Sequence, residues 1–476
     1  MNMEKRSNYR WTICALLFFA TTVNYMDRQV LSLTWTDWIQ PEFHWSNEDY
    51  GNVTGLFSLA YAISLLFAGK FVDWMGTKKG YLWAIFIWSL GACVHALCGI
   101  ATSGLLGEGW FASFAEARES IARISDVTLV ATTSATLFII ARVVLALGEA
   151  GNFPAAIKTT AEYFPKKDRG LATSIFNAGA TIGALMAPLS IPFIAAAWGW
   201  EMAFIVIGGL GFVWMGFWLF MYHKPEETAR VNKAELAYIN QDDVAEGITS
   251  EQSDKKSIPF AKMFRYKQTW AFIVGKFMTD GVWWFYLFWI PAYLKQVYGL
   301  SSTESAPMIF VLYLITLLSI IGGWLPTFFI DKKSMNPYAG RMRSMLIFAF
   351  FPLLALFAQP LGNTSVWLPV IIIGIAGAAH QAWSANIFST VGDMFPRSAI
   401  ASVTGIGGMA GGVGSFLLQK SSGKLFDYTA NTDLNLFGFH GEEAGYFIIF
   451  SFCAVAYLIA WAMMKALVPK MKIITV

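Results

Sequence analysis

Long apolar stretches recur along the whole chain and are separated by short polar segments. A helix needs about 20 residues to cross a hydrocarbon core of roughly 30 Å, and twelve stretches of this sequence fit that template. The predicted spans are residues 11–35, 50–72, 80–101, 129–155, 170–196, 202–222, 269–294, 305–330, 342–360, 366–389, 400–420 and 444–468. The pattern therefore predicts an all-α polytopic membrane protein with twelve transmembrane helices.

The longest polar interruption separates the sixth predicted span from the seventh. Its charges alternate in sign, so residues 223–268 predict a solvated linker that contains a short helix. We therefore divide the chain into an N-terminal six-helix bundle at 1–222, the cytoplasmic linker at 223–268 and a C-terminal six-helix bundle at 269–476. Another polar segment, Gly107 to Asp126, has apolar residues at helical spacing, and we expect a surface helix there.

The two halves of the chain resemble each other. Glu162-Tyr-Phe-Pro165 follows the fourth span, and Asp393-Met-Phe-Pro396 follows the tenth. In that register Gly183 of the fifth span aligns with Gly414 of the eleventh. Internal repeats of this kind are common among secondary transporters, so we expect two pseudo-symmetric bundles.

Composition supports a membrane chain and excludes several other classes. Of the 476 residues, 56% are hydrophobic and only 14% are charged, compared with roughly 25% charged residues in average soluble domains. The net charge of +3 gives no reason to expect a nucleic-acid partner. No phosphate-binding loop, HExxH, GxSxG or Cys/His cluster occurs in the sequence. We therefore expect no enzyme activity, no cofactor and no metal.

The distribution of basic residues predicts the orientation in the membrane. Under the twelve-span count, Lys78, Lys79, Lys332, Lys333 and Arg341 lie on the same side as both termini, and the opposite side has few basic residues. Cytoplasmic loops carry an excess of Lys and Arg. We therefore expect both termini in the cytoplasm.

Four charged residues lie deep inside two predicted spans. The first span contains Asp27 and Arg28, and the fourth contains Arg142 and Glu149. The spacing in the fourth span corresponds to two helical turns, which places both side chains on one face, about 10 Å apart along the axis. An ionisable group in the bilayer core costs at least about 2.5–3.5 kcal/mol, so it persists where it faces a wet cavity or an ionic partner. A purely structural ion-pair network is the alternative interpretation.

The residue types suggest a division of roles among these four groups. A guanidinium can donate two hydrogen bonds to one carboxylate, which suits Arg28 and Arg142 to an organic anion. Arginine stays protonated and cannot carry a driving proton, whereas Asp27 and Glu149 can gain and lose one. The pattern therefore indicates an anion site beside proton-carrying carboxylates.

Further polar residues lie in the seventh and tenth spans. Lys276 and Asp280 are one turn apart and predict an ion pair, although Lys276 could also extend towards the membrane surface. Gln381, Ser384 and Asn386 offer neutral donors and acceptors that suit sugar hydroxyls.

Other groups in these spans allow two interpretations each. His380 could shuttle a proton or simply bond a neighbouring helix. The aromatic residues between Trp283 and Trp289 fit helix packing, and one of them could instead stack on a sugar face. Lys276, Asp280 and His380 are therefore accessory candidates.

Three segments carry a resemblance to a known family. Gly69-Lys-Phe-Val-Asp73-Trp-Met-Gly76 resembles the loop signature of the major facilitator superfamily, with Trp74 where that family usually has arginine. Asn24-Tyr-Met-Asp-Arg28 and Gly148-Glu-Ala-Gly-Asn-Phe-Pro154 resemble its anion:cation symporter branch. The chain is thus similar to proton-driven carriers of organic anions.

Within that branch, the residues of the second half most resemble bacterial hexuronate transporters. The segments that carry this resemblance are 276–280, 283–291 and 380–386. The fifth-span glutamine of related sugar-acid carriers is replaced here by Ala180.

The resemblance implies proton-coupled symport of a hexuronate, such as glucuronate or galacturonate, by alternating access across a bacterial inner membrane. It assigns proton coupling to Asp27 and Glu149, and gating to Gly69, Asp73 and Gly76. The substrate-binding candidates, including the tyrosines that match cavity residues of the branch, are Arg28, Arg142, Tyr25, Tyr61, Gln381, Ser384 and Asn386. We expect a monomer whose partners are the anionic sugar, protons and membrane lipid.

Two alternatives differ in cargo or class. The same mechanism could carry an aldonate, an aldarate or another small organic anion. A nutrient receptor with a transporter-like fold would need a long cytoplasmic signalling extension, and neither terminus is expected to supply one.

Overall fold

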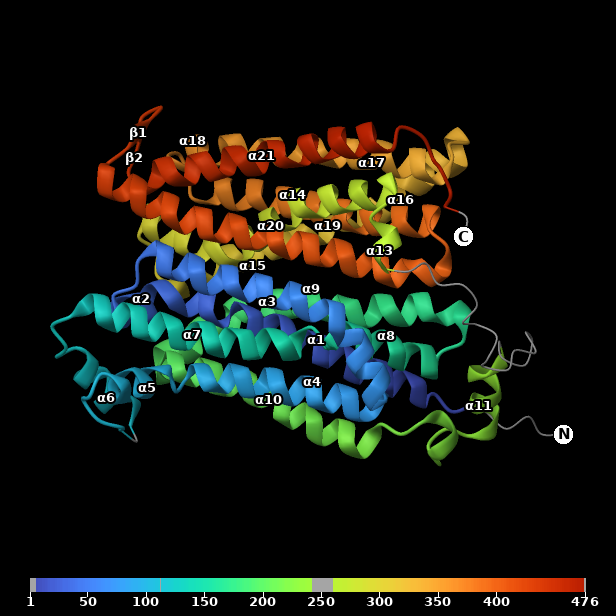
Figure 1. Cartoon of the computed structure of the whole chain (residues 1–476), viewed down its shortest axis with the longest axis horizontal. Coiled ribbons are helices and arrows are strands. Elements are labelled where there is room, and N and C mark those ends of the chain that lie inside the picture. Colours follow the sequence, from blue (N-terminus) through green and yellow to red (C-terminus); the bar gives the residue numbers. More distant parts are fainter. Residues whose placement is uncertain (1–5, 112, 242–259, 475–476) are drawn as a thin grey trace.

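The computed structural model describes residues 6–111, 113–241 and 260–474, so residues 242–259 of the predicted linker lie outside the described residues. Most helices run roughly side by side along the long axis (Figure 1). The helices of the N-terminal half lie on one side of the molecule and those of the C-terminal half on the other. We call the end where α1 begins and α21 finishes the terminal end, and the opposite end, which carries α2 and the β-hairpin, the distal end.

The N-terminal half consists of helices, two of them short turns of other helix types. In chain order they are α1 (Tyr9–Thr34), π-helical η1 (Trp35–Ile39), α2 (Gln40–Phe43), α3 (Asn47–Met75), α4 (Thr77–His95), α5 (Cys98–Leu105), α6 (Phe114–Ile121), α7 (Val127–Glu149), α8 (Asn152–Tyr163), α9 (Lys166–Trp198), α10 (Trp200–Met221), 3₁₀-helical η2 (Pro225–Glu227) and α11 (Lys233–Ile239).

The C-terminal half is also helical, apart from one small antiparallel hairpin at the distal end. Its elements are α13 (Phe260–Met263), α14 (Lys267–Tyr298), α15 (Ser302–Thr316), 3₁₀-helical η3 (Leu317–Ile320), α16 (Ile321–Thr327), π-helical η4 (Phe328–Lys332), α17 (Pro337–Phe350), 3₁₀-helical η5 (Phe351–Phe357), α18 (Ala358–Gly362), α19 (Trp367–Met394), α20 (Arg397–Thr432), β1 (Asn435–Leu436), β2 (Phe439–His440) and α21 (Glu442–Leu467).

Each predicted span falls on a helix or on a run of consecutive helices. Among the described residues, eight such runs are long and apolar enough to cross a membrane, and a ninth is the pair α4 and α5, which is bent by 57°. Three further long helices, α1, α14 and α20, are less apolar because they carry charged, polar or glycine residues. The chain is therefore an all-α polytopic membrane protein, as its sequence predicts.

Within each half, a glycine lets one long helix pack closely against another. A Cβ added at Gly183 of α9 would collide with the carbonyl oxygen of Thr22 on α1. A Cβ added at Gly414 of α20 would collide in the same way with the carbonyl oxygen of Phe277 on α14. Small residues permit such backbone approach in lipid, where packing rather than water drives helix association. The aligned glycines thus serve the same purpose in both halves.

Polar contacts join the two halves at the distal end. Lys295 of α14 pairs with Asp37 of η1 at 2.9 Å. Asp427 of α20 accepts hydrogen bonds from the backbone N–H groups of Asn47 and Glu48, at 2.9 and 2.7 Å. Because these N–H groups begin α3, the carboxylate of one half caps a helix of the other. The described contacts therefore hold the distal end closed.

Both polar segments for which the sequence predicts a short helix contain one among the described residues. The predicted surface helix between Gly107 and Asp126 is confirmed as α6. The linker contains a short helix, α11, as the sequence predicts, and one side chain of that helix is not solvated: Glu235 is fully buried and pairs with Arg10 at 2.8 Å. The same carboxylate accepts the backbone N–H of Tyr9, so the linker helix is docked on the start of α1.

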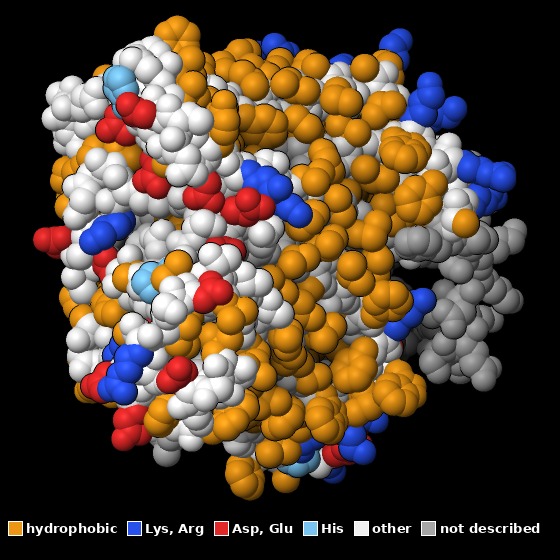
Figure 2. Space-filling view, turned by 60° about the vertical axis from the view of Figure 1, so that its left-hand side comes forward, with side chains coloured by type: hydrophobic (Ala, Val, Ile, Leu, Met, Phe, Trp, Pro, Cys, Tyr) orange, Lys and Arg blue, Asp and Glu red, His pale blue; other side chains and the backbone are white. Residues whose placement is uncertain are grey.

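The surface fits a membrane location. Figure 2 shows a wide zone of hydrophobic side chains between a distal end with charges of both signs and an opposite edge where Lys and Arg gather. Phe67, Phe193 and Phe220 are large hydrophobic residues that are exposed on predicted spans. Their exposure is expected where lipid rather than water surrounds the protein.

Candidate substrate and proton site

The two predicted charge pairs of the N-terminal half meet between α1 and α7. Arg28 donates to one oxygen of Glu149 from Nε at 3.0 Å and from Nη2 at 2.7 Å. The Arg28 side chain is 5% exposed and that of Glu149 is fully buried. The first-span arginine therefore pairs with the fourth-span carboxylate and not with its neighbour Asp27.

Aromatic rings surround the Arg28 guanidinium. Its Cζ lies 4.7 Å from the ring centroid of Tyr61, 5.0 Å from that of Tyr25 and 5.0 Å from that of Trp284. Such rings attract a cation through their negative faces. Because Trp284 belongs to α14, this cage spans both halves of the molecule. The tyrosines predicted to line the cavity are thus beside the predicted anion-binding arginine.

The other two charges of the cluster lack hydrogen-bond partners among the described residues. All three nitrogen atoms of the Arg142 guanidinium are buried without an acceptor, and so are both carboxylate oxygens of Asp27 without a donor. The Cζ of Arg142 lies 5.2 Å from the centroid of the Phe57 ring, and the Cζ of Arg28 lies 5.9 Å from the same centroid. A buried group left without partners costs free energy. This unused hydrogen-bonding capacity suits a ligand that carries a carboxylate and hydroxyl groups.

A break in the fourth span positions Glu149. Helix α7 ends at Glu149 and α8 begins at Asn152. A Cβ added at the preceding Gly148 would collide with the backbone of Trp88 on α4. The glycine therefore allows α7 to press against α4 at the level of the charge cluster. The sequence analysis predicts one span over 129–155, and Gly151 and Pro154 lie at the break within it.

The accessory candidates of the C-terminal half form two separate contacts. Lys276 pairs with Asp280 at 2.7 Å, as predicted, with the side chains 6% and 14% exposed. Nδ1 of His380 lies 2.8 Å from the Tyr457 hydroxyl, and the imidazole stacks on Trp283 with ring centroids 5.4 Å apart. His380 is thus held by neighbouring helices, and its role in proton transfer stays a prediction.

The neutral candidates on α19 differ in their surroundings. The amide nitrogen of Asn386 donates to the carbonyl oxygens of Gly322 and Ala382 at 2.9 and 2.8 Å, so it already joins α19 to α16. Gln381 and Ser384 are half-buried on the same helix. A role in binding sugar hydroxyls stays a prediction for all three α19 candidates.

The predicted gating motif covers the last turns of α3, with Gly69 and Asp73, and the turn into α4 at Gly76. Asp73 pairs with Lys158 of α8 at 2.8 Å, and Trp74, in the position where arginine is usual, is 80% exposed. Gly76 has φ = 77°, a conformation that favours glycine, and lets the chain turn directly from one helix into the next. The motif aspartate therefore has a basic partner from the fourth span.

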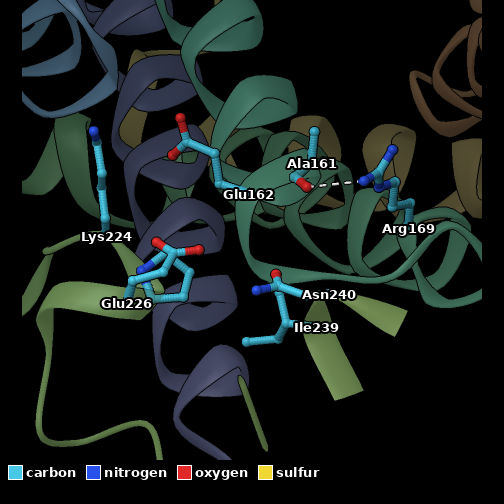
Figure 3. A pocket seen from close by; sticks show the side chains of 8 residues that line it. Ala161, Glu162, Arg169, Lys224, Glu226, Ile239 and Asn240 are labelled. Atoms are coloured by element: carbon cyan, nitrogen blue, oxygen red, sulfur yellow. Dashed lines mark hydrogen bonds between the residues drawn. The ribbon is translucent and has the colours of Figure 1, made fainter. Parts of the chain in front are cut away.

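A pocket of about 230 Å³ lies at the terminal end, away from the charge cluster (Figure 3). Arg169 and Lys224 line it together with Glu162 and Glu226, and Arg169 donates to the carbonyl oxygen of Ala161 at 2.9 Å. It contains none of the residues that the sequence predicts for substrate or proton binding. Its balanced charges give no preference for an anion.

Sequence reasoning missed a charge cluster at the distal end. Arg118 of α6 donates to Glu42 at 3.0 Å and to Glu201 at 2.6 Å, and Trp200 donates to Glu42 at 2.7 Å. Burial raises the pKa of the Glu42 carboxyl to about 7, although the hydrogen bonds that Glu42 accepts from Trp200 and Arg118 oppose the rise. The cluster ties α6 to α2 and α10. Little in the sequence indicated the cluster, because Arg118 is one of two arginines in the segment 107–126 and its partners are far away in the chain.

The raised pKa of Glu42 makes stability depend on pH. The Glu42 carboxyl binds its proton more tightly in the folded than in the unfolded protein. The free energy of unfolding therefore falls as pH rises from about 4.5 to about 7. The change in pKa corresponds to about 3 kcal/mol. The melting temperature of wild type minus that of Glu42→Gln should therefore fall between pH 5 and pH 8 in detergent. The exposed Glu119→Gln is the control, and an equal pH dependence for both variants would contradict this assignment.

The fold and the site together define a class of protein. Two helical halves, a closed distal end and a buried cluster of arginines and carboxylates that Trp284 of the other half borders are the features of a secondary transporter rather than of an enzyme. The model of the Major Facilitator Superfamily matches residues 17–418. The chain therefore belongs to the Major Facilitator Superfamily and is a membrane transporter.

Known relatives place it near sugar-acid carriers. The chain is 27% identical over 434 residues to the hexuronate transporter of Escherichia coli strain K12, covering 89% of each chain. It is 25% identical over 432 residues to a probable galactarate/D-glucarate transporter of the same strain, again covering 89% of each. A solved structure of a bacterial homologue of the lysosomal transporter Spinster, inward-facing and unoccupied, has a TM-score of 0.67 at 19% identity and covers 96% of this chain and 97% of its own.

Proposed function

We propose that this protein is a proton-coupled symporter that imports a hexuronate, such as glucuronate or galacturonate, by alternating access. The observation that carries the proposal is the buried cluster in which Arg28 pairs with Glu149 while Arg142 and Asp27 have no hydrogen-bond partner among the described residues. The hexuronate transporter to which the chain is similar supports the substrate class.

Arg142 is the first docking point for the substrate carboxylate, because its donors are free to form two charge-assisted hydrogen bonds. Protonation of Glu149 removes the charge that holds Arg28 and frees that guanidinium for the substrate. The cluster holds two arginines and two carboxylates, so a monoanion and one proton enter together without net charge. Asp27 is the second group that can hold a proton.

The remaining assignments follow from the same mechanism. Tyr25 and Tyr61 face the Arg28 guanidinium and border the substrate, and Asp73 with Gly69 and Gly76 forms the gate at the terminal end. That end, where Lys and Arg gather, is cytoplasmic, in a bacterial inner membrane. The protein works as a monomer with bundles at 1–222 and 269–476.

The substrate test is competition for uptake of labelled galacturonate into proteoliposomes. Glucuronate should compete, whereas glucose should not, because a neutral sugar forfeits both charge-assisted hydrogen bonds, worth about 3 kcal/mol or more together. Uptake should rise when a proton gradient is imposed. Equal competition by glucose would exclude an anion site, and uptake that ignores the gradient would exclude proton coupling.

A second candidate keeps the mechanism and changes the cargo to an aldarate or aldonate. It is favoured by similarity to the probable galactarate/D-glucarate transporter. A panel of labelled hexuronates, aldonates and aldarates separates the two candidates by relative uptake.

A further inference from the structure

The ion pair Lys276–Asp280 lies on α14, one to two turns from Trp284, which contacts the charge cluster. Lys276, Asp280 and Trp284 are spaced four residues apart, so around the helix Asp280 is turned by about 40° and Lys276 by about 80° from Trp284. Trp284 lies 5.0 Å from the Arg28 guanidinium. At 1.5 Å per residue, Asp280 follows about 6 Å and Lys276 about 12 Å further along the axis.

Among the described residues, Lys276 is the ionic partner of Asp280. One oxygen lies 2.7 Å from the Lys276 ammonium, and the other is buried without a hydrogen-bond partner among the described residues. The first oxygen also lies so close to α20 that a Cβ at Gly411 would collide with it. A carboxylate buried for structural purposes is normally satisfied by further donors, so the contact that accounts for Asp280 is its charge against Lys276.

We infer that Asp280 selects the charge of the substrate by neutralising the one cation that α14 carries in this region. With Lys276 neutralised, the C-terminal half presents no net charge to the end of the substrate that points away from the arginines. A hexuronate has an uncharged carbonyl or hemiacetal group at that end, whereas an aldarate has a second carboxylate there. The pair therefore favours a monocarboxylate sugar over the corresponding dicarboxylate.

This inference rests on the proposed function and makes a distinct prediction. Galacturonate and galactarate share one carbon skeleton, and the far carbon is a carbonyl or a ring hemiacetal in galacturonate but a carboxylate in open-chain galactarate. In Asp280→Asn, the Lys276 ammonium lacks its counter-charge and can bind the second carboxylate of galactarate. One hydrogen bond between charged groups is worth about 1.5–3 kcal/mol, so galactarate binding relative to galacturonate binding should rise at least about tenfold.

Calorimetry on the purified full chain measures both ligands with wild type, with Asp280→Asn and with the double variant Lys276→Met/Asp280→Asn. The double variant restores neutrality, so it should return the ratio to within about threefold of wild type, a difference of about 0.7 kcal/mol or less. A ratio that Asp280→Asn leaves unchanged, or that the double variant leaves raised, would overturn the inference. If wild type binds neither sugar acid, the hexuronate assignment fails. In that case, galactarate binding by Asp280→Asn alone still supports the role of Asp280, and its absence refutes that role.

Discussion

Glu149→Gln should abolish concentrative uptake while leaving exchange of substrate across the membrane. The substitution keeps the size of the side chain and an oxygen that can accept from Arg28, but it removes the charge and the titration. Arg28 then lacks the ionic partner that both of its hydrogen bonds reach, and the site is fixed in the state that protonation would produce. Exchange needs no proton release, so it should stay within about threefold of wild type. Accumulation in vesicles under a proton gradient should fall to equilibration.

Two companion variants make this result specific. Glu201→Gln removes another carboxylate, 4% exposed, that belongs to the distal cluster with Arg118, and it should accumulate substrate like wild type. Asp27→Asn leaves the Arg28–Glu149 pair intact and should impair driven uptake if Asp27 holds a proton. Full accumulation by Glu149→Gln would remove Glu149 from the coupling mechanism.

Substitution of Arg142 should cause the largest loss of substrate binding. Its three guanidinium nitrogens are buried without acceptors in the part of the chain that the structure describes, so these donors are available to a ligand. Arg142→Gln should weaken hexuronate binding by about 100-fold or more, because two charge-assisted hydrogen bonds are lost. Arg142→Lys retains the charge without the planar fork and should bind about tenfold more weakly than wild type. Calorimetry on purified protein measures both effects.

Controls separate binding from folding and from coupling. Each variant should retain a single cooperative thermal transition, and Arg118→Lys, at the distal cluster, should bind normally. Arg28→Lys should weaken binding less than Arg142→Gln, because Arg28 is held by Glu149 before the substrate arrives. Asp27→Asn should bind at least as well as wild type. Normal binding by Arg142→Gln would return the cluster to a structural ion-pair network.

The helices were predictable because their cause is local. A span needs enough consecutive apolar residues to cover a hydrocarbon core and intrahelical partners for every backbone group, and both conditions can be read from short windows of sequence. Even α1 and α14, which carry Asp27, Arg28, Lys276 and Asp280, were recognisable by their length. The pair Lys276–Asp280 was predictable for the same reason, since residues four apart on one helix are neighbours.

Contacts between distant segments were not predictable in this way. The sequence by itself determined which charges are buried in spans, and their cost in lipid identified them as candidates for function. Only the tertiary structure decided that Arg28 binds Glu149, that Arg142 and Asp27 have no hydrogen-bond partner among the described residues, and that Arg118 joins α6 to Glu42 and Glu201. These outcomes depend on the direction in which each helix faces and on how closely glycines such as Gly148 and Gly183 let the helices approach. Helix packing fixes both quantities, and no short stretch of sequence contains them.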